Sequence, residues 1–211
     1  MKTRSDKWFF GLIAASLVGV AIAVGAVMVV TSAKARAPLA RFRQLEPFQL
    51  TERSGRTIEG KDLAGKIVVA DFFFGSCSAE CQILNQRMAE IQDLAAGADD
   101  VLLVSITVDP KSDTPEALTR YAAQLGASPT RWLFLTGKKS AIYPFIQQSF
   151  LLAVAAPDTT TLNTASGASF IHSDKIALVD RHGVVRAYYD GVAATTPRDV
   201  WRDICKLRAE P

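Results

Sequence analysis

Apolar residues recur along this chain in two patterns. Unbroken apolar runs are typical of strands that are buried on both faces of a sheet. Runs of this kind include KIVVADFFFG (66–75), VLLVSITVD (101–109) and WLFLTG (132–137). The segments between them, 77–94 and 113–126, carry apolar residues at helical spacing instead. The pattern therefore predicts strands that alternate with helices.

The helix predicted over 113–126 has clear end signals. Thr114 can cap its start, Pro115 suits a first helical turn, and Glu116 complements the positive end of the helix dipole. Gly126 is a typical stop. We therefore expect this helix to begin directly after the strand at 101–109 and its Pro110.

The remaining pattern completes an α/β fold. The further predicted elements are a hairpin around Ser54-Gly55, a helix over 140–150 despite Pro144, a strand in FLLAVAA (150–156), a hairpin of 175–180 with 184–191, and a helix over 196–207. Alternating elements of this kind predict a central mixed sheet flanked by helices. A strand followed by cysteines at a helix start, then βα and a ββα ending, is the order of a thioredoxin-like fold.

One long apolar run precedes the predicted domain. Trp8–Val30 contains 23 residues and no charge. At about 1.5 Å per residue it is long enough to cross a hydrocarbon core of about 30 Å. A cleaved signal peptide is the alternative, because Ala33–Ala37 offers two A-x-A sites, but its apolar region is usually shorter. We expect a retained transmembrane helix.

These features divide the chain into four parts. We expect a short tail over 1–7, a transmembrane helix over 8–30, a basic stalk over 31–46 and the thioredoxin-like domain over 47–211. A short tail before one span most often leaves a long C-terminal domain outside the cytoplasm. The expected location is therefore the inner (cytoplasmic) membrane, with the domain on the periplasmic side. The tail lacks an Arg- and Ser-rich presequence, which favours a bacterial host.

Composition and charge narrow the range of partners. The 211 residues are 49% hydrophobic, which excludes disorder as the main state. The net charge is +3, and residues 1–30 carry +2 of it, so the remaining chain is nearly neutral. Nothing in this balance indicates nucleic-acid binding. Small neutral partners or another membrane protein are favoured.

Two cysteines stand where the strand 66–75 meets the following helix. Cys77 and Cys81 are four residues apart, and a helix N-terminus favours the thiolate over the thiol. Two thiolates can exchange with a disulfide, and together with an imidazole they form a three-coordinate site that suits Cu(I). The spacing differs from C-x-x-C, the usual redox pair, which favours metal binding.

The other candidate residues are two histidines and a third cysteine. His172 follows a polar loop and precedes the strand at 175–180, so it can supply the imidazole. His182 lies in a predicted turn and is interpreted as an exposed turn residue. Cys205 falls among apolar residues of the last helix, and we expect a half-buried packing thiol that alkylates slowly in the folded protein.

Four segments taken together resemble the Sco/SenC family of membrane-anchored copper chaperones. They are the N-terminal span, FFFGSCSAEC, SITVDPKSDTPEALTRYAAQLG and IHSDKIALVDRHGVV. The resemblance covers roughly 48–201 and implies a thioredoxin-like fold. It places Cys77, Cys81 and His172 on the family's copper-ligand positions. It also implies Cu(I)/Cu(II) binding and help in building the CuA centre of cytochrome c oxidase, whose CuA-bearing subunit would be the partner.

The chain departs from the family at two places. Gln82 follows the second cysteine where many members have Pro, and Ser78-Ala79-Glu80 lacks the Pro often found between the cysteines. Glu80 adds a negative charge beside the thiolates, which favours a cationic metal. These departures leave the expected ligands in place but bear on the redox properties of the pair.

Three functions fit these residues. A copper metallochaperone requires Cys77, Cys81 and His172 to converge, and it is the function that we favour. A thiol–disulfide oxidoreductase, which reduces the cysteines of a client protein, requires only the cysteine pair and can coexist with copper delivery. A membrane-tethered binding domain would use the pair as a structural bridge. We expect no turnover enzyme beyond thiol–disulfide exchange.

Overall fold

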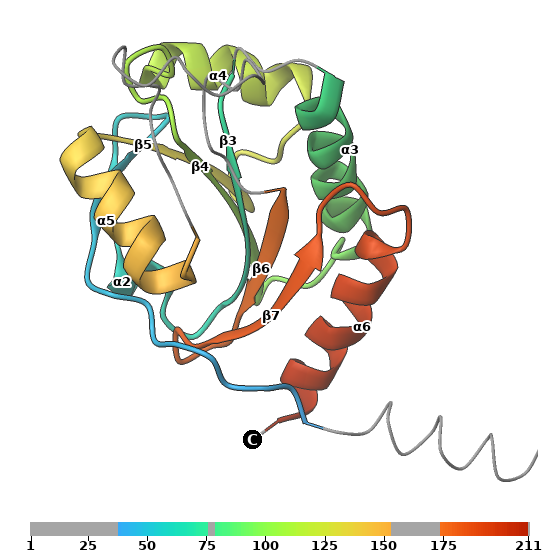
Figure 1. Ribbon diagram of the computed structural model, residues 1–211. Coiled ribbons are helices and arrows are strands. Elements are labelled where there is room, and N and C mark those ends of the chain that lie inside the picture. Colours follow the sequence, from blue (N-terminus) through green and yellow to red (C-terminus); the bar gives the residue numbers. More distant parts are fainter. Residues whose placement is uncertain (1–37, 76–78, 153–173, 211) are drawn as a thin grey trace, which may run out of the picture. The chain divides into compact units, whose positions relative to one another are not determined.

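The computed structural model describes residues 38–75, 79–152 and 174–210, and the chain from Leu39 onward forms one compact unit. Seven strands of the described residues form a single sheet in the order β2-β1-β5-β4-β3-β6-β7 (Figure 1). The strands are β1 Gln49–Glu52, β2 Thr57–Glu59, β3 Ile67–Phe73, β4 Val101–Thr107, β5 Trp132–Thr136, β6 Lys175–Val179 and β7 Val185–Asp190. The helices are α2 Gly60–Leu63, α3 Ala79–Leu94, α4 Pro115–Gln124, α5 Lys139–Phe150 and α6 Thr196–Ala209.

The sheet is mixed, as predicted. Strands β3, β4 and β5 are parallel, whereas β6 pairs antiparallel with β3 and β1 pairs antiparallel with β5. Phe73 at the end of β3 lies opposite Thr107 at the end of β4. The carboxyl ends of these two strands therefore share one edge of the sheet, and the connections to α3 and α4 leave from that edge.

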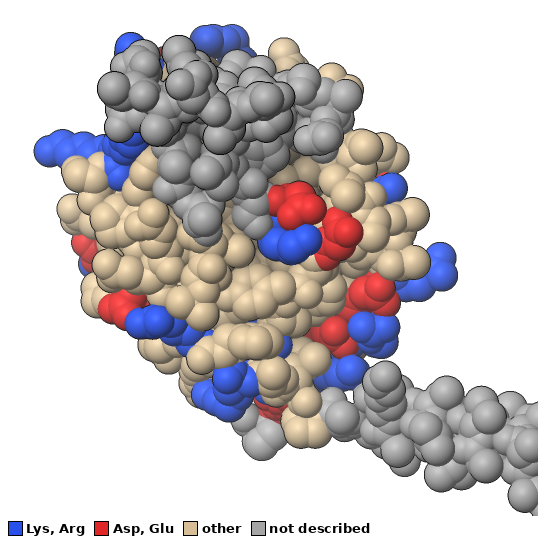
Figure 2. Space-filling view, viewed as in Figure 1, with Lys and Arg blue, Asp and Glu red and all other residues tan. Residues whose placement is uncertain are grey.

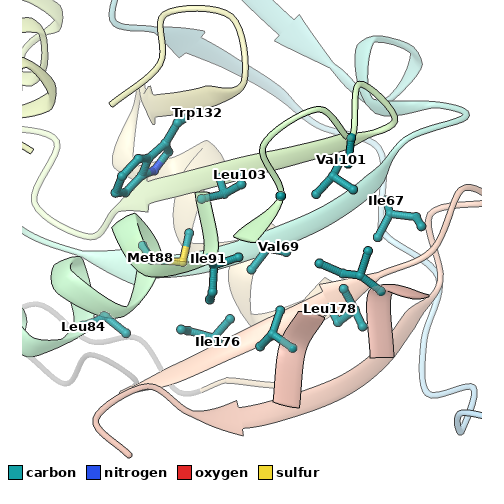
Figure 3. Close-up of a cluster of buried hydrophobic side chains, with 14 of the residues drawn as sticks. Ile67, Val69, Leu84, Met88, Ile91, Val101, Leu103, Trp132, Ile176 and Leu178 are labelled. Atoms are coloured by element: carbon teal, nitrogen blue, oxygen red, sulfur yellow. The ribbon is translucent and has the colours of Figure 1, made fainter. Parts of the chain in front are cut away.

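Helices cover both faces of the sheet. Every residue of β3 is buried, because alternate side chains pack into two separate cores. One core lies under α3, α4 and α6, and Figure 3 shows part of it, with Leu84, Met88 and Ile91 of α3 against Val69 and neighbouring strand residues. The other core lies mainly under α5. This arrangement confirms the predicted sheet between two helical layers.

The signals at the start of α4 work as the sequence predicts. Thr114 is extended and its hydroxyl accepts a hydrogen bond from the Ala117 N–H at 3.3 Å. Pro115 is the first residue of the helix, and Gly126 has a left-handed φ of 64° beyond its end. This cap fixes where the chain turns from the β4 edge into α4.

Some local predictions are wrong. The strand predicted in FLLAVAA (150–156) does not begin at Phe150, which is the last residue of α5, and Leu151 has a left-handed φ of 54°. Residues 153–156 of that prediction lie outside the described residues. Burial explains this, since Phe150 continues the apolar face of α5 and packs against Phe72 at a ring distance of 4.9 Å. In α3, Ile83 and Leu94 lie outside the core and are 39% and 42% exposed.

The compact unit includes part of the segment predicted as a stalk. Residues 39–46 run beside the start of β7, where the Phe42 N–H donates to the Val185 carbonyl at 2.9 Å and the Val185 N–H donates to the Arg43 carbonyl at 2.7 Å. The buried Arg186 guanidinium holds this segment through the carbonyls of Leu39 and Ala40. The predicted apolar span, Trp8–Val30, lies outside the described residues. No helix within the described ranges has the length and apolar character that crossing a membrane requires.

Arg186 also joins two acidic side chains. It contacts Asp180 at 3.0 Å and Glu210 at 2.7 Å, and we call these three residues, with the carbonyls of Leu39 and Ala40, the Arg186 junction. Figure 2 shows Lys, Arg, Asp and Glu scattered over a face that consists mostly of other residues. Exposed pairs such as Arg202–Asp199 contribute only about 0–1 kcal/mol each.

Candidate functional site

The cysteine pair follows β3 in the chain, and the described residues that flank it lie at the edge of the sheet where β3 ends. Cys81 is the third residue of α3, in the turn whose backbone N–H groups have no partner within the helix. Cys77 and His172 lie outside the described residues. The structure therefore defines the site by its flanks: Gly75 before the cysteine pair, Leu84 after it and Asp174 after the histidine.

Gly191 brings two of these flanks together. Its N–H donates to the Asp174 carbonyl at 2.6 Å, directly after β7. A Cβ at this position would lie 2.2 Å from the Leu84 side chain and 2.5 Å from the Asp174 oxygen. Asp174 is two residues from His172, and Leu84 is three residues from Cys81. The flank of the histidine and the flank of the cysteines therefore border the same glycine.

Asp113 lies at the other flank, beside the end of β3. Both of its carboxylate oxygens accept from the Gly75 N–H, at 3.2 and 3.1 Å, and one also accepts from the Thr107 hydroxyl. The side chain is 4% exposed, and burial raises the pKa of this carboxyl above its usual value.

A second polar contact supports α3 one turn beyond Cys81. The Asn85 amide donates to the Tyr121 hydroxyl of α4 at 2.5 Å, and the Tyr121 ring stacks on Phe73 with centroids 5.3 Å apart. Burial raises the pKa of Tyr121 to about 12, with a smaller contribution from the charges of Asp71 and Asp113. The contact ties the first half of α3 to α4 and to the end of β3.

A carboxyl group is buried deeper in the sheet. Asp71 of β3 has no exposed surface, and its Oδ1 accepts from the Ser105 hydroxyl at 2.5 Å, while the Trp132 indole donates to the Ser105 oxygen at 2.8 Å. The other carboxyl oxygen, Oδ2, has no hydrogen-bond partner in the described part of the chain. Burial raises the pKa of Asp71 to about 7, so this carboxyl keeps its proton to a higher pH than an exposed aspartate does.

The remaining two candidates have different outcomes. His182 is exposed in the turn between β6 and β7, as predicted, and Gly183 follows it with φ 76°. Cys205 is exposed, so the prediction of a half-buried thiol is wrong, and the slow alkylation expected from that burial loses its basis. The apolar stripe of α6 runs through Val200, Ile204 and Leu207, and a residue directly after Ile204 points about 100° away from that stripe.

The sequence pattern did not identify the buried polar residues near the end of β3. Asp71 interrupts an otherwise apolar strand, which is a signal of a special role that the pattern alone leaves undefined. Asp113 is only the first residue of the helical segment predicted over 113–126. Within the described ranges, no three His, Cys, Asp or Glu side chains gather closely enough to hold a metal. Any metal site of the predicted kind thus depends on Cys77 and His172.

Comparison with known proteins places this architecture in a family. The SCO1/SenC family model matches residues 37–208. The SCO1 protein homolog of Bacillus subtilis is 32% identical over 163 residues, which are 76% of this chain and 81% of the relative.

Solved structures agree with this match. A SCO1/SenC family lipoprotein from Bacillus anthracis is 33% identical with a TM-score of 0.72, and 82% of this chain aligns with all of that chain. BsSco, a member of the Sco family of cytochrome c oxidase assembly proteins described as having a disulfide switch, is 29% identical with a TM-score of 0.70 over 82% of this chain and 97% of its own. The copper-bound ScoI of Bradyrhizobium japonicum, 24% identical over 82% of this chain and 99% of its own, shares the fold with a TM-score of 0.60. The thioredoxin-like fold and the sequence matches together show that the chain belongs to the SCO1/SenC family.

Proposed function

We propose that this protein is a copper carrier that binds Cu(I) or Cu(II) through Cys77, Cys81 and His172 and delivers it to the CuA site of cytochrome c oxidase. Two thiolates suit Cu(I), and an imidazole ligand suits both oxidation states. Copper is the cargo in this proposal, so the site must both hold and release it. Family membership supports the assignment, and ScoI of B. japonicum carries copper on the same fold.

The observation that carries the proposal is the shared contact at Gly191. Leu84, three residues after Cys81, and Asp174, two residues after His172, both border this glycine. Segments that are about ninety positions apart in the chain therefore meet at the edge where α3 begins. This meeting is what a three-residue copper site requires of the fold.

Copper binding by the full-length chain, purified in mild detergent and loaded anaerobically, tests the proposal. The unmodified chain should bind copper, and Cys77→Ser or Cys81→Ser should abolish tight binding because one thiolate is lost. His172→Ala should weaken binding and change the Cu(II) spectrum. Affinity should fall as pH drops, since protons compete with copper for the thiolates.

The second histidine is the matched control. His182 is exposed in a turn at the opposite end of the sheet, so His182→Ala should leave affinity and spectrum unchanged. If His172→Ala binds copper as tightly as the unmodified chain, with an unchanged spectrum, the three-residue site is wrong and thiol exchange becomes the better assignment.

A thiol–disulfide oxidoreductase is the second candidate. The position of Cys81 in the first turn of α3 favours it, and BsSco is described as having a disulfide switch. The test is the rate of thiol alkylation against pH, with the exposed Cys205 as an internal reference. At pH 6 the cysteine pair should react faster than Cys205. Equal rates would remove the helix-terminus argument for reactive thiolates.

We further propose that Trp8–Val30 is a retained anchor in the inner membrane and that the compact domain lies on the periplasmic side. The uncharged length of this run and the basic residues on both sides support the proposal. N-terminal sequencing of the mature protein tests it. A mature chain beginning near Lys34, Arg36 or Pro38 would show cleavage instead.

A further inference from the structure

Gly75 is the last described residue before Cys77, and a buried side chain holds it. Its N–H donates to both carboxylate oxygens of Asp113, at 3.2 and 3.1 Å. Asp113 is 4% exposed, whereas Gly75 itself is exposed. The N–H of an exposed backbone position ordinarily donates to water. Here it donates to a buried carboxylate instead, which restricts where the backbone of Gly75 can lie.

The contact leaves no room for a side chain at position 75. A Cβ on Gly75 would lie 2.6 Å from Asp113 Oδ1, which is closer than real Cβ contacts. The backbone φ of Gly75 is not left-handed, so conformational freedom does not explain the glycine. The close approach of the carboxylate does explain it.

Asp113 is itself held rigidly. Its carboxylate accepts from the Thr107 hydroxyl at the end of β4, and its N–H donates to the Asp109 carbonyl at 3.0 Å. The Thr107 oxygen in turn accepts from the Asp109 N–H at 2.9 Å, and Thr114 begins the cap of α4. The carboxylate therefore connects the end of β4 and the start of α4 to the end of β3.

We propose that Asp113 is a positioning residue for the copper site, whose carboxylate sets the direction in which the chain leaves β3 toward Cys77. The inference rests on the proposed copper-carrier function. Cys77 is only two residues beyond the held N–H, so a shift at Gly75 is passed to the thiolate with little chain in which to absorb it. Asp113 acts through the backbone and is not assigned a bond to copper.

Two single variants and their combination test this role, because each breaks the same contact from a different side. Asp113→Ala removes the acceptor, and Gly75→Ala pushes it away. Each should weaken copper binding by about 10–100-fold, the range typical when a group supporting a metal ligand is removed. Each should also shift the Cu(II) paramagnetic resonance spectrum. The loss of copper affinity in the double variant should be smaller than the sum of the losses in the two single variants, since the deleted carboxylate leaves room for the Cβ.

The matched control is Asp180→Asn at the opposite end of the sheet. Asp180 is 5% exposed and also accepts from backbone N–H groups, so its loss should lower the melting temperature with copper affinity and spectrum unchanged. The role is overturned if Asp113→Ala and Gly75→Ala fold and bind copper with the spectrum of the unmodified chain. It is also overturned if Asp180→Asn produces the same spectral shift.

A second measurement keeps this test separate from the copper assignment. The alkylation rate of the reduced cysteine pair requires no metal, and it should change in Asp113→Ala and Gly75→Ala but not in Asp180→Asn. If the unmodified chain binds no copper, the proposed function fails, and the thiol rates still decide the positioning role. Unchanged thiol rates in both variants would overturn that role.

Discussion

The buried charged side chains at the two ends of the central sheet have different partners. At the end where β7 begins, the buried Arg186 guanidinium lies between Asp180 and Glu210, and each acid has a cation within 3.0 Å. At the end where β3 finishes, Asp71 and Asp113 are as deeply buried but are held by hydroxyl and N–H groups. Among the described residues, neither acid forms an ion pair with Lys or Arg.

The difference distinguishes buried charges that stabilise the fold from buried charges that do not. A buried charge that is neutralised by its neighbour serves the fold, and opposite charges stabilise the ionised form of each group. Indeed the acids of the Arg186 junction raise the pKa of Arg186, Glu210 most of all. A buried carboxyl without a cation is instead unfavourable to the fold, as the raised pKa of Asp71 shows. Such groups collect at the end of the sheet where the proposed site lies.

Removing the guanidinium of the Arg186 junction should have the largest effect on stability. Arg186→Ala leaves the buried Asp180 with only the exposed Arg41 at 3.8 Å and frees the carbonyls of Leu39 and Ala40, so it should cost about 3–5 kcal/mol of unfolding free energy. Chemical denaturation measures this loss. Copper affinity of the folded fraction should not change, and a change would break the separation between the two ends.

Removing a charge at the other end should stabilise the protein. Below about pH 4, Asp71 is protonated in both the folded and unfolded states. Between about pH 4 and pH 7 only the unfolded state ionises, so the stability of the unmodified protein falls as pH rises through this window.

Asp71→Asn cannot ionise, so its advantage should be absent at pH 4 and complete at pH 8. At about 1.4 kcal/mol for each pKa unit, the gain at pH 8 should be roughly 2–4 kcal/mol. Urea unfolding at the two pH values measures it. A variant that is less stable than the unmodified chain at pH 8 would show that Asp71 serves the fold after all.

A change at Gly191 should affect both the fold and the site. Gly191→Ala forces a Cβ against the Asp174 carbonyl and the Leu84 side chain, and overpacking of this kind costs about 1–3 kcal/mol. Because the flanks of Cys81 and His172 meet there, copper affinity should fall as well. Affinity equal to that of the unmodified chain would show that the contact is not part of the site.

Removing the cap of α4 should have the smallest effect on stability, and it serves as a control for Asp113→Ala. Thr114→Ala removes the hydroxyl that accepts from Ala117 and should cost about 1 kcal/mol in unfolding free energy. Thr114 is the neighbour of Asp113 but does not contact Gly75 through a described hydrogen bond. Its variant should therefore lose stability with an unchanged copper spectrum, in contrast to Asp113→Ala.

Local elements were predictable because their signals are local. The unbroken apolar run of β3 and the cap signals of α4 each act within a few residues, and the structure confirms both. The polar supports were not predictable, since Asp113 reaches Gly75 across 38 positions and only the fold brings them together. The exposure of Cys205 depends likewise on which face of α6 packs against the sheet.

The Arg186 junction has a mechanical consequence. The chain enters the compact unit at Leu39, whose carbonyl is held by Arg186, and the same guanidinium holds Glu210 near the other end of the chain. A pulling force on the entering segment would be resisted first by this junction and by the hydrogen bonds that Phe42 donates to Val185 of β7 and Leu45 donates to Gly183 in the turn before it. The force would act along the direction of residues 39–46 and β7, so the hydrogen bonds between these two segments would bear it together. Gly75 and the start of α3 lie at the far end of the strands, outside the path of that force.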